Sequence, residues 1–421
     1  MNRSWAIAPL LLAGCTPLDP PQPASPPDAA TSLATAPPAR PDVAILPARL
    51  GEVALANRDF GLELFRNLAA KPGNIFLSPI SLAGAFGPVS AGAQGETGEA
   101  IGKVLRFPGS DAALHLQLGG LLRTLDSDTE GARVSIANGM WLMRGYTVNP
   151  AFVAVARESY GAEVASLDFR NGAVAAARIN AWVERETNNR IRHLIAPDSL
   201  DVLTRVVVTN AVHFLGDWAQ PFNSSRTRPE PFYLAAGGTR QVPMMSSNRF
   251  TRLTQVEAVQ LLELPYKGGR LAMAVILPKK RGGLAAVEAN LTDERLGQWL
   301  RQLDSADQGE VLVQLPKVQI DSSYQLNEPL KTMGMAVAFD RDRANFRGIA
   351  DTEQLFISQV LHKTFLRIDE KGTEAGAATA IEIQAESSAE PPTFRADHPF
   401  LILIRDKPTG AVLFLGRIAA P

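Results

Sequence analysis

Residues 369–392 read DEKGTEAGAATAIEIQAESSAEPP, and this stretch decides how the rest of the chain is interpreted. From Thr373 onward its side chains alternate with period two, as in a half-buried β-strand. Small side chains dominate the first half and bury little area at ~25 cal/mol per Å², so they hold the segment only weakly. The Ser/Ala/Pro end is typical of an exposed loop. We therefore expect a segment that is able to lie outside a sheet as a loop or inside it as a strand.

Two simpler interpretations of this segment stay open at this point. An Ala-rich helix is disfavoured, because Gly372 and Gly376 each cost about 1 kcal/mol relative to Ala and no apolar stripe at helical spacing is present. An ordinary strand, with no second location, fits the alternation equally well on this segment alone.

Other segments of the chain help to decide between these interpretations of residues 369–392. Residues 370–379, EKGTEAGAAT, resemble the hinge of the serpin reactive-centre loop, and DHPFLILI at 397–404 resembles the strand that follows this loop in that family. Further segments similar to serpins occur in family order: NIFLSPIS (74–81), GAQGET (92–97), TNAVHFLGDW (209–218), VPMM (242–245) and LPY (264–266). The resemblance covers residues 50–421. It implies a large mixed or antiparallel sheet, further sheets, about eight to nine helices, and an exposed reactive-centre loop at about 370–395.

Periodicity along the chain independently favours an α+β body, because helices and strands are mixed without a βαβ repeat. Helices are predicted over 50–68, from Pro79, from Thr97, and over 112–125, 150–160, 173–190, 284–303 and 326–333. Strands are predicted over 132–142, 162–169 and 311–320, with several more between 232 and 278. The continuous β-branched run at 205–214 indicates a central strand that is buried on both faces.

The serpin resemblance implies an inhibitor of serine proteases that acts as a suicide substrate. The protease cleaves the exposed loop, and the cleaved loop inserts into the main sheet with the enzyme still attached. Counting from Glu370 places the reactive bond at Glu386–Ser387, whereas counting back from residues 398–400 moves it one or two residues later, to Ser387 or Ser388. An elastase- or subtilisin-like protease would recognise Ala385 instead. A further interpretation is that Glu386 is only a solvated loop residue with no role in specificity.

Further site residues are implied by the matching motifs. Ser78, Ser81, Asn210 and His362 match a polar cluster below the point where the sheet opens, and Trp218 matches the tryptophan where insertion begins; for His362 a hydrogen-bonded core histidine is the simpler interpretation. The hinge is expected to comprise the following residues: Glu370, Gly372, Thr373, Glu374, Ala375, Gly376, Ala377, Ala378 and Thr379.

Composition excludes several other functions. With a net charge of −1 over 421 residues, the chain has no bulk attraction for nucleic acid. Five histidines occur without a nucleophile elbow, a zinc-binding helix or a Cys pair, so we expect no metal and no cofactor. Residues 112–125 lack a basic stripe, which argues against heparin activation. The expected partner is a target protease, bound by a monomer; a non-inhibitory binding module on the same fold and an envelope hydrolase are the alternatives.

The N-terminus predicts export and lipidation. Residues 1–14 form a short signal, with Arg3 before the apolar run from Trp5 to Leu12. LAGC at 12–15 resembles the bacterial lipobox, which implies a lipidated Cys15, and this is the only cysteine in the chain. Thr16, in place of an inner-membrane retention signal, favours the outer membrane of the cell envelope. The Pro/Ala-rich residues 15–48 are expected to be a disordered tether for a domain spanning 49–421.

Overall fold

The structure is a computed structural model, and it describes residues 1, 31–32, 47–109, 112–126, 131–351, 355–373 and 390–421. The helices of this part are α1 (Pro47–Ala69), α2 (Pro79–Gly92), α3 (Gly95–Leu105), α4 (Ala112–Asp126), α5 (Pro150–Tyr160), α6 (Gly172–Glu186), α7 (Leu284–Ala289), α8 (Asp293–Ser305) and α9 (Asn327–Leu330). A π-helical turn at Lys331–Met335 follows α9 directly.

Two β-sheets form the centre of the molecule. The seven-stranded sheet has, in spatial order, β1 (Thr31–Ser32), β4 (Glu163–Leu167), β3 (Ala132–Met143), β5 (Val206–Asp217), β13 (Gly372–Thr373), β12 (Ile357–Ile368) and β11 (Val318–Gln325). The nine-stranded sheet has β14 (Thr393–Arg395), β10 (Gln308–Pro316), β7 (Thr239–Val256), β8 (Val259–Pro265), β9 (Leu271–Pro278), β15 (Phe400–Asp406), β16 (Val412–Ile418) and β2 (Ile75–Leu77), with β6 (Arg228–Tyr233) paired to β7.

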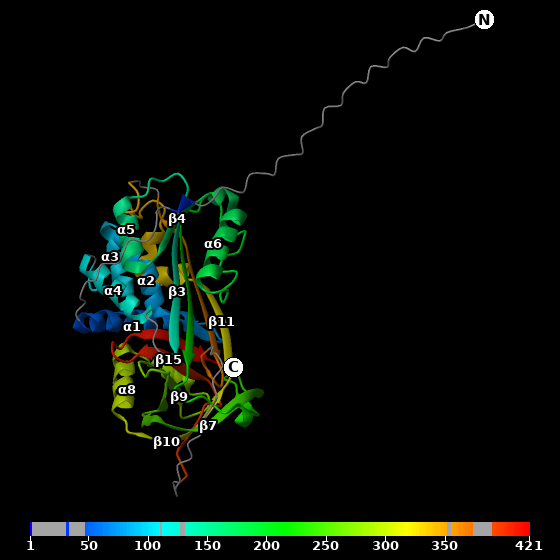
Figure 1. The fold of residues 1–421 in the computed structure, drawn as a ribbon. Coiled ribbons are helices and arrows are strands. Elements are labelled where there is room, and N and C mark those ends of the chain that lie inside the picture. The colour runs from blue at the N-terminus through cyan, green and yellow to red at the C-terminus, as the bar shows by residue number, and fades with distance from the viewer. Residues whose placement is uncertain (2–30, 33–46, 110–111, 127–130, 352–354, 374–389) are drawn as a thin grey trace.

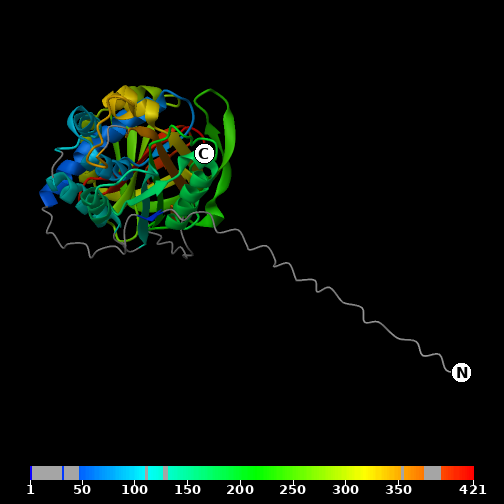
Figure 2. The ribbon, with the colours of Figure 1, turned by 90° about the horizontal axis from the view of Figure 1, so that it is seen from above.

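Helices cover the two faces of the seven-stranded sheet. In Figure 1, α6 lies on one side of the long strands and α2 to α5 lie on the other. The view from above shows the N-terminal helices, in blue and cyan, grouped on one side of the strands (Figure 2). The mixed α+β architecture expected from the sequence is confirmed, and β5 lies in the centre of its sheet between β3 and β12, as its β-branched run predicted.

Local capping explains where several predicted helices begin and end. The Ser78 side chain accepts a hydrogen bond from the Ser81 amide, and Pro79 occupies the first helical position, so α2 starts where the sequence predicted. The helix predicted to reach residue 190 ends at Glu186, because Asn188 and Asn189 adopt left-handed conformations with φ of 50° and 61°.

Two predicted elements are each divided in the structure. The helix predicted over 284–303 is two helices, because Thr292 caps a new start at α8 by accepting from the Arg295 amide. The prediction of a single strand over 311–320 was wrong, because this segment is divided after Pro316. Proline ends the ladder of β10, and β11 begins at Val318 in the other sheet.

The segment predicted to be a tether, residues 15–48, is described only in part. Thr31–Ser32 pair antiparallel with Ala165 and Ser166 of β4, and α1 begins at Pro47, two residues before the predicted start of the domain. The rest of this segment and the signal residues 2–14 lie outside the described residues. Among the described residues, no helix is both long and apolar enough to cross a bilayer.

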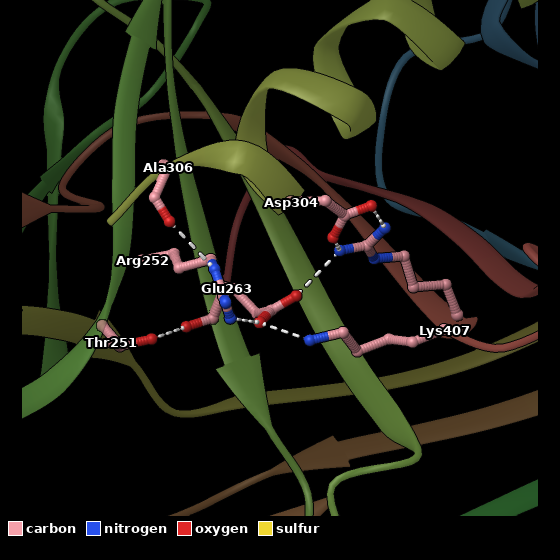
Figure 3. Close-up of polar contacts among 7 residues, drawn as sticks. Thr251, Arg252, Glu263, Asp304, Ala306 and Lys407 are labelled. Atoms are coloured by element: carbon pink, nitrogen blue, oxygen red, sulfur yellow. Dashed lines mark hydrogen bonds and ion pairs between the residues drawn. The ribbon is translucent and has the colours of Figure 1, made fainter. Parts of the chain in front are cut away.

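A buried charge cluster fixes the nine-stranded sheet (Figure 3). Glu263 of β8, 2% exposed, accepts from Arg405 at 2.7 Å, Lys407 at 2.9 Å and Arg252 at 3.3 Å. Arg405 also pairs with Asp304 at the end of α8, and Arg252 donates to the carbonyl oxygen of Ala306. Because breaking a buried ion pair costs about 3–5 kcal/mol, this cluster holds β7, β8, β15 and α8 together as one unit.

Candidate functional site

Strands β5 and β12 are parallel neighbours that separate at one end. Their ladder runs from Ile357 opposite Val206 to Phe365 opposite His213. Beyond this point β13 lies between them and pairs antiparallel with both, since Thr373 is opposite Gly216 of β5 and Ile368 of β12. Gly372 and Thr373, the latter being the first residue of the alternating segment, therefore already occupy the position of an additional strand.

Both residues of β13 fit tightly. Thr373 is fully buried, and its hydroxyl group lies 2.7 Å from the hydroxyl group of Tyr266. A Cβ atom at position 372 would collide with the carbonyl oxygen of Gly216, so only glycine lets the chain approach β5 this closely. The close approach to β5 thus requires glycine at position 372.

Trp218 holds the chain that leads into β13. Its ring is fully buried and stacks on Tyr266 at 4.7 Å, while its indole N–H donates to the carbonyl oxygen of Asp369 at 3.0 Å. Its main-chain N–H donates to the carbonyl oxygen of Lys371 at 2.9 Å. These bonds place Trp218 where the alternating segment enters the sheet.

Glu370 is fixed by both its main chain and its side chain. Its carbonyl oxygen accepts from the Phe222 amide at 2.6 Å, and its carboxylate accepts from Thr227 at 2.8 Å and Lys317 at 2.7 Å. Partial burial acts to raise the pKa of Glu370, but the hydrogen bond from Lys317 and those from its other donors outweigh burial and lower this pKa below its ordinary value. The carboxylate is therefore ionised at neutral pH.

The remaining hinge and reactive-bond residues are not among those described. Glu374, Ala375, Gly376, Ala377, Ala378, Thr379, Ala385, Glu386, Ser387 and Ser388 all lie within 374–389, outside the described residues. The chain is described again from Glu390, and β14 then pairs parallel with β10. The roles assigned to those ten residues remain predictions.

The structure brings Ser78, Ser81, Asn210 and His362 together in one buried cluster. His362 of β12 is opposite Asn210 of β5 in the parallel ladder, and its Nδ1 lies 2.6 Å from Asn210 Oδ1. The amide nitrogen of Asn210 reaches the carbonyl oxygen of Ser81 at 3.1 Å, and the Ser78 hydroxyl donates to the carbonyl oxygen of Leu413 at 2.6 Å. The cluster thus links both strands to the start of α2.

The hydrogen bonds fix the proton on His362. The Ser78 amide donates to Nε2 at 3.2 Å, so Nε2 has no proton and Nδ1 donates to Asn210. Complete burial lowers the pKa of His362 to about 3, so the imidazole is neutral at physiological pH. A neutral donor and a neutral acceptor therefore connect β5 to β12 within this buried cluster.

Comparison with known proteins identifies the family. A family model described as "Serpin (serine protease inhibitor)" matches residues 55–421. The chain belongs to the serpin family. This serpin is 39% identical over 375 residues to an uncharacterized serpin-like protein of Thermococcus kodakarensis, covering 88% of this chain and 86% of that protein.

Two further relatives agree with this assignment. The leukocyte elastase inhibitor of Bos taurus is 36% identical, over 88% of this chain and 100% of that protein. Uncleaved ovalbumin superposes with a TM-score of 0.81 at 30% identity, covering 88% of this chain and all of that one. The predicted serpin fold is thereby confirmed, and with it membership of a family of serine protease inhibitors rather than of catalysts.

Sequence reasoning missed two residues of this serpin's site. Asn138 of β3 points its Oδ1 at the Asn210 amide, 2.6 Å away, and is 4% exposed. A polar residue between buried positions of a predicted strand was the available signal. Tyr266 lies in the LPY motif, but only the folded chain shows that its hydroxyl group meets Thr373.

The contacts of two histidines, His398 and His115, differ from those of a Ser-His-Asp triad. His398 contacts Asp397 at 2.8 Å, but its other ring nitrogen is engaged by the carbonyl oxygen of Pro278 at 2.7 Å and not by a serine. His115 contacts the Tyr160 hydroxyl group at 2.6 Å. In the same part of the chain, no group of three or more His, Cys, Asp or Glu side chains is placed to hold a metal.

Acid should weaken the native state through His362. Below about pH 6.5 the unfolded chain binds a proton at this histidine while the folded chain, with its pKa near 3, does not. The free energy of unfolding should therefore fall by ~1.4 kcal/mol per pH unit from this residue alone, until the folded state also titrates. Urea unfolding midpoints at about pH 7.5, 6 and 5 measure this slope, and His362→Asn should reduce it.

The control for this experiment is His193→Asn. His193 is exposed and has a φ of 53°, which asparagine tolerates, so this variant is a matched histidine replacement outside the buried cluster. Burial and Arg190 also lower the pKa of His213, to about 4, so some slope should remain in His362→Asn. Identical slopes in the wild type and His362→Asn would contradict the assignment.

Proposed function

We propose that this serpin inhibits a serine protease as a suicide substrate, by inserting its cleaved reactive loop between β5 and β12. Reactive-loop insertion into a sheet is a known property of serpins. The observation that carries the proposal is the position of β13, whose two residues already pair with both strands. Residues 374 onward continue the same alternation, so they would extend this strand in the same register.

Hydrogen bonding favours insertion. At present β5 and β12 share one parallel ladder. An inserted strand would replace it with two antiparallel ladders, and the antiparallel arrangement is slightly more stable per residue. Each additional backbone hydrogen bond contributes about 0.5–1.5 kcal/mol net, and burial of Ile381 and Ile383 adds about 1.5–3 kcal/mol each. The inserted state therefore has the lower free energy.

Kinetics hold the loop outside. Before a strand enters, β5 and β12 must separate, which breaks the bond between His362 and Asn210 in a fully buried site. Each buried polar group left without a partner costs about 1–3 kcal/mol until a new one arrives. The native fold is in this account metastable, and cleavage of the loop releases it.

Cleavage is proposed at Glu386–Ser387. A protease that reads Glu386 would prefer acidic side chains, whereas one that reads Ala385 would prefer small ones, as elastase- and subtilisin-like enzymes do. Sequencing the new N-terminus of the cleaved serpin distinguishes these sites.

A covalent complex with the target protease is the direct test of inhibition. The full chain with Cys15→Ser, which removes the expected lipidation site, is incubated with a panel of serine proteases. We expect a band that survives boiling in detergent and has the combined mass of both proteins. Cleavage without such a band would indicate the non-inhibitory binding module, and ester turnover that is lost with one Ser or His substitution would indicate a hydrolase.

Thr373→Arg should turn this inhibitor into a substrate. The substitution would bury a guanidinium group beside Tyr266 at a position that is fully buried, and burial of an unpaired charge is strongly unfavourable. The number of inhibitor molecules cleaved per protease inactivated should rise at least about tenfold. Thr393→Arg, at an exposed threonine of β14 that pairs with β10, is the matched control and should leave this ratio unchanged. Normal complex formation by Thr373→Arg would count against insertion.

Cleavage of the loop should also raise thermal stability. Limited proteolysis within 374–389 frees the loop to form the two ladders, so the midpoint of thermal unfolding should increase by tens of degrees if about ten new hydrogen bonds form. Differential scanning calorimetry before and after clipping measures the change. An unchanged midpoint would mean that the loop does not insert.

We infer from the sequence that Cys15 anchors this serpin to the outer membrane of the cell envelope, with residues 15–48 as the tether. In the producing bacterium, wild-type protein should fractionate with membranes and incorporate labelled palmitate. The Cys15→Ser variant should do neither. Its inhibition of a protease would show that it still folds. Membrane fractionation of Cys15→Ser at the wild-type level would refute lipidation as the anchor.

A further inference from the structure

The pairing of β13 determines where each later residue of the loop would lie if this strand were extended. Thr373 is opposite Gly216 of β5, and the two strands are antiparallel. In an antiparallel ladder without a bulge, each further residue of the loop pairs with the preceding residue of β5. Ile383 would then lie opposite Val206, the first residue of β5, so the acidic end of the loop, residues 382–386, would reach the start of that strand.

The same register assigns each loop residue to one face of the sheet, because residues directly opposite each other point to the same face. Val206 belongs to the main hydrophobic core, whereas Val207 packs in a separate cluster with residues of α6, the helix on the other side of the long strands (Figure 1). Ile383, opposite Val206, would therefore join the core. Glu382, opposite Val207, would lie on the face that α6 covers.

Arg205 lies beside the position that this acidic end would take. It directly precedes β5, and its main-chain N–H donates to the hydroxyl group of Ser358 in β12 at 2.8 Å, at the end of the ladder between the two strands. The continued register places Arg205 opposite Gln384, with Glu382 and Glu386 as its diagonal neighbours. Diagonal neighbours are about 7–8 Å apart, which a long side chain can bridge.

The guanidinium group of Arg205 has no acidic partner within the described part of the chain. It is half-buried and donates to the carbonyl oxygens of Val202 at 2.9 Å and Thr204 at 3.1 Å. The carboxylate of Asp201, in the same turn, already accepts from the amides of Leu203 and Thr204. The charge of Arg205 can therefore pair with a carboxylate that arrives with the loop.

We propose that Arg205 is a positioning residue for the last part of the inserted loop, where its guanidinium group pairs with Glu382 and Glu386. This inference rests on the proposed insertion of the loop and adds the residue that completes it. Without a counter-charge, insertion would move Glu382 out of water towards the face covered by α6, which is unfavourable. Glu382 stays on the inserted fragment at every cleavage site considered above, so the pairing does not depend on which bond is cut.

Protease inactivation by the full chain with Cys15→Ser tests the proposal. Arg205→Gln should raise the number of serpin molecules cleaved per protease inactivated about threefold to fivefold, because insertion of the acidic end becomes less favourable. Arg205→Lys keeps the charge and should stay within about twofold of the wild type. The matched control is Arg144→Gln, an exposed arginine at the same end of the sheet but on the other side of β5, where the Met143 amide donates to the Arg205 carbonyl oxygen. It should leave the ratio unchanged.

Two further measurements separate an ion pair from a purely structural role of Arg205. The effect of Arg205→Gln should shrink between about 0.05 M and about 1 M sodium chloride, because salt screens the attraction between charges. Arg205→Glu should raise the ratio further than Arg205→Gln, and adding Glu382→Arg should restore part of the loss. The second substitution leaves Glu386, at the proposed reactive bond, unchanged.

The clipped chain isolates the inserted state from the trapping of a protease. Arg205→Gln should lower the midpoint of thermal unfolding of the clipped serpin by a few degrees, and that of the intact serpin by less, because only the clipped form contains the ion pair. If clipping stabilises the chain but no protease is trapped, this comparison alone decides the inference.

Equal ratios for the wild type and Arg205→Gln at low salt, with equal midpoints of the clipped forms, would overturn the inference and leave insertion unaffected. So would the absence of any recovery when Glu382→Arg is added to Arg205→Glu. A wild-type chain that forms no covalent complex and gains no thermal stability on clipping would contradict the proposed insertion itself. The two hypotheses therefore fail by different results.

Discussion

The structure depends on one constraint: β5 and β12 lie side by side and parallel, joined by one ladder where an intervening antiparallel strand would form two. The chain leading into β13 reaches the open end of this pair, where Gly372 and Thr373 pair with β5. Glycine is required at position 372 because the carbonyl oxygen of Gly216 in β5 leaves no room for a Cβ atom.

The two sheets have different mechanical roles. The nine-stranded sheet is fixed by the charge cluster around Glu263, in which opposite charges from three strands and α8 satisfy one another (Figure 3). Tyr266, which directly follows β8, contacts the chain that leads into the other sheet, since it stacks on Trp218 and its hydroxyl group meets that of Thr373. The start of the loop is thus held against the nine-stranded sheet, and under the proposed insertion these contacts would define its starting register.

Motifs close together in sequence were predictable, and contacts between distant segments were not. Ser78 and Pro79 predict the start of α2 from the capping preferences of these two residues alone. The β-branched run of β5 likewise predicts a central strand. Asn138 meets Asn210 only because β3 and β5 pair in one particular register, which no single strand pattern specifies. The chain from β10 to β11 reads as one strand because Pro316 interrupts the ladder without interrupting the hydrophobic alternation.

The polar character of the contact between β5 and β12 has a kinetic consequence. Apolar side chains in contact lose their attraction gradually as they separate, and water soon compensates the rest. A buried hydrogen bond between His362 and Asn210 is lost within a short displacement, before water or an incoming strand supplies new partners. Loss of this hydrogen bond therefore raises the free energy of the transition state for strand separation more than that of the end states. We infer that a neutral, fully hydrogen-bonded pair lets this sheet combine a low free energy for the inserted state with slow entry in the absence of a protease.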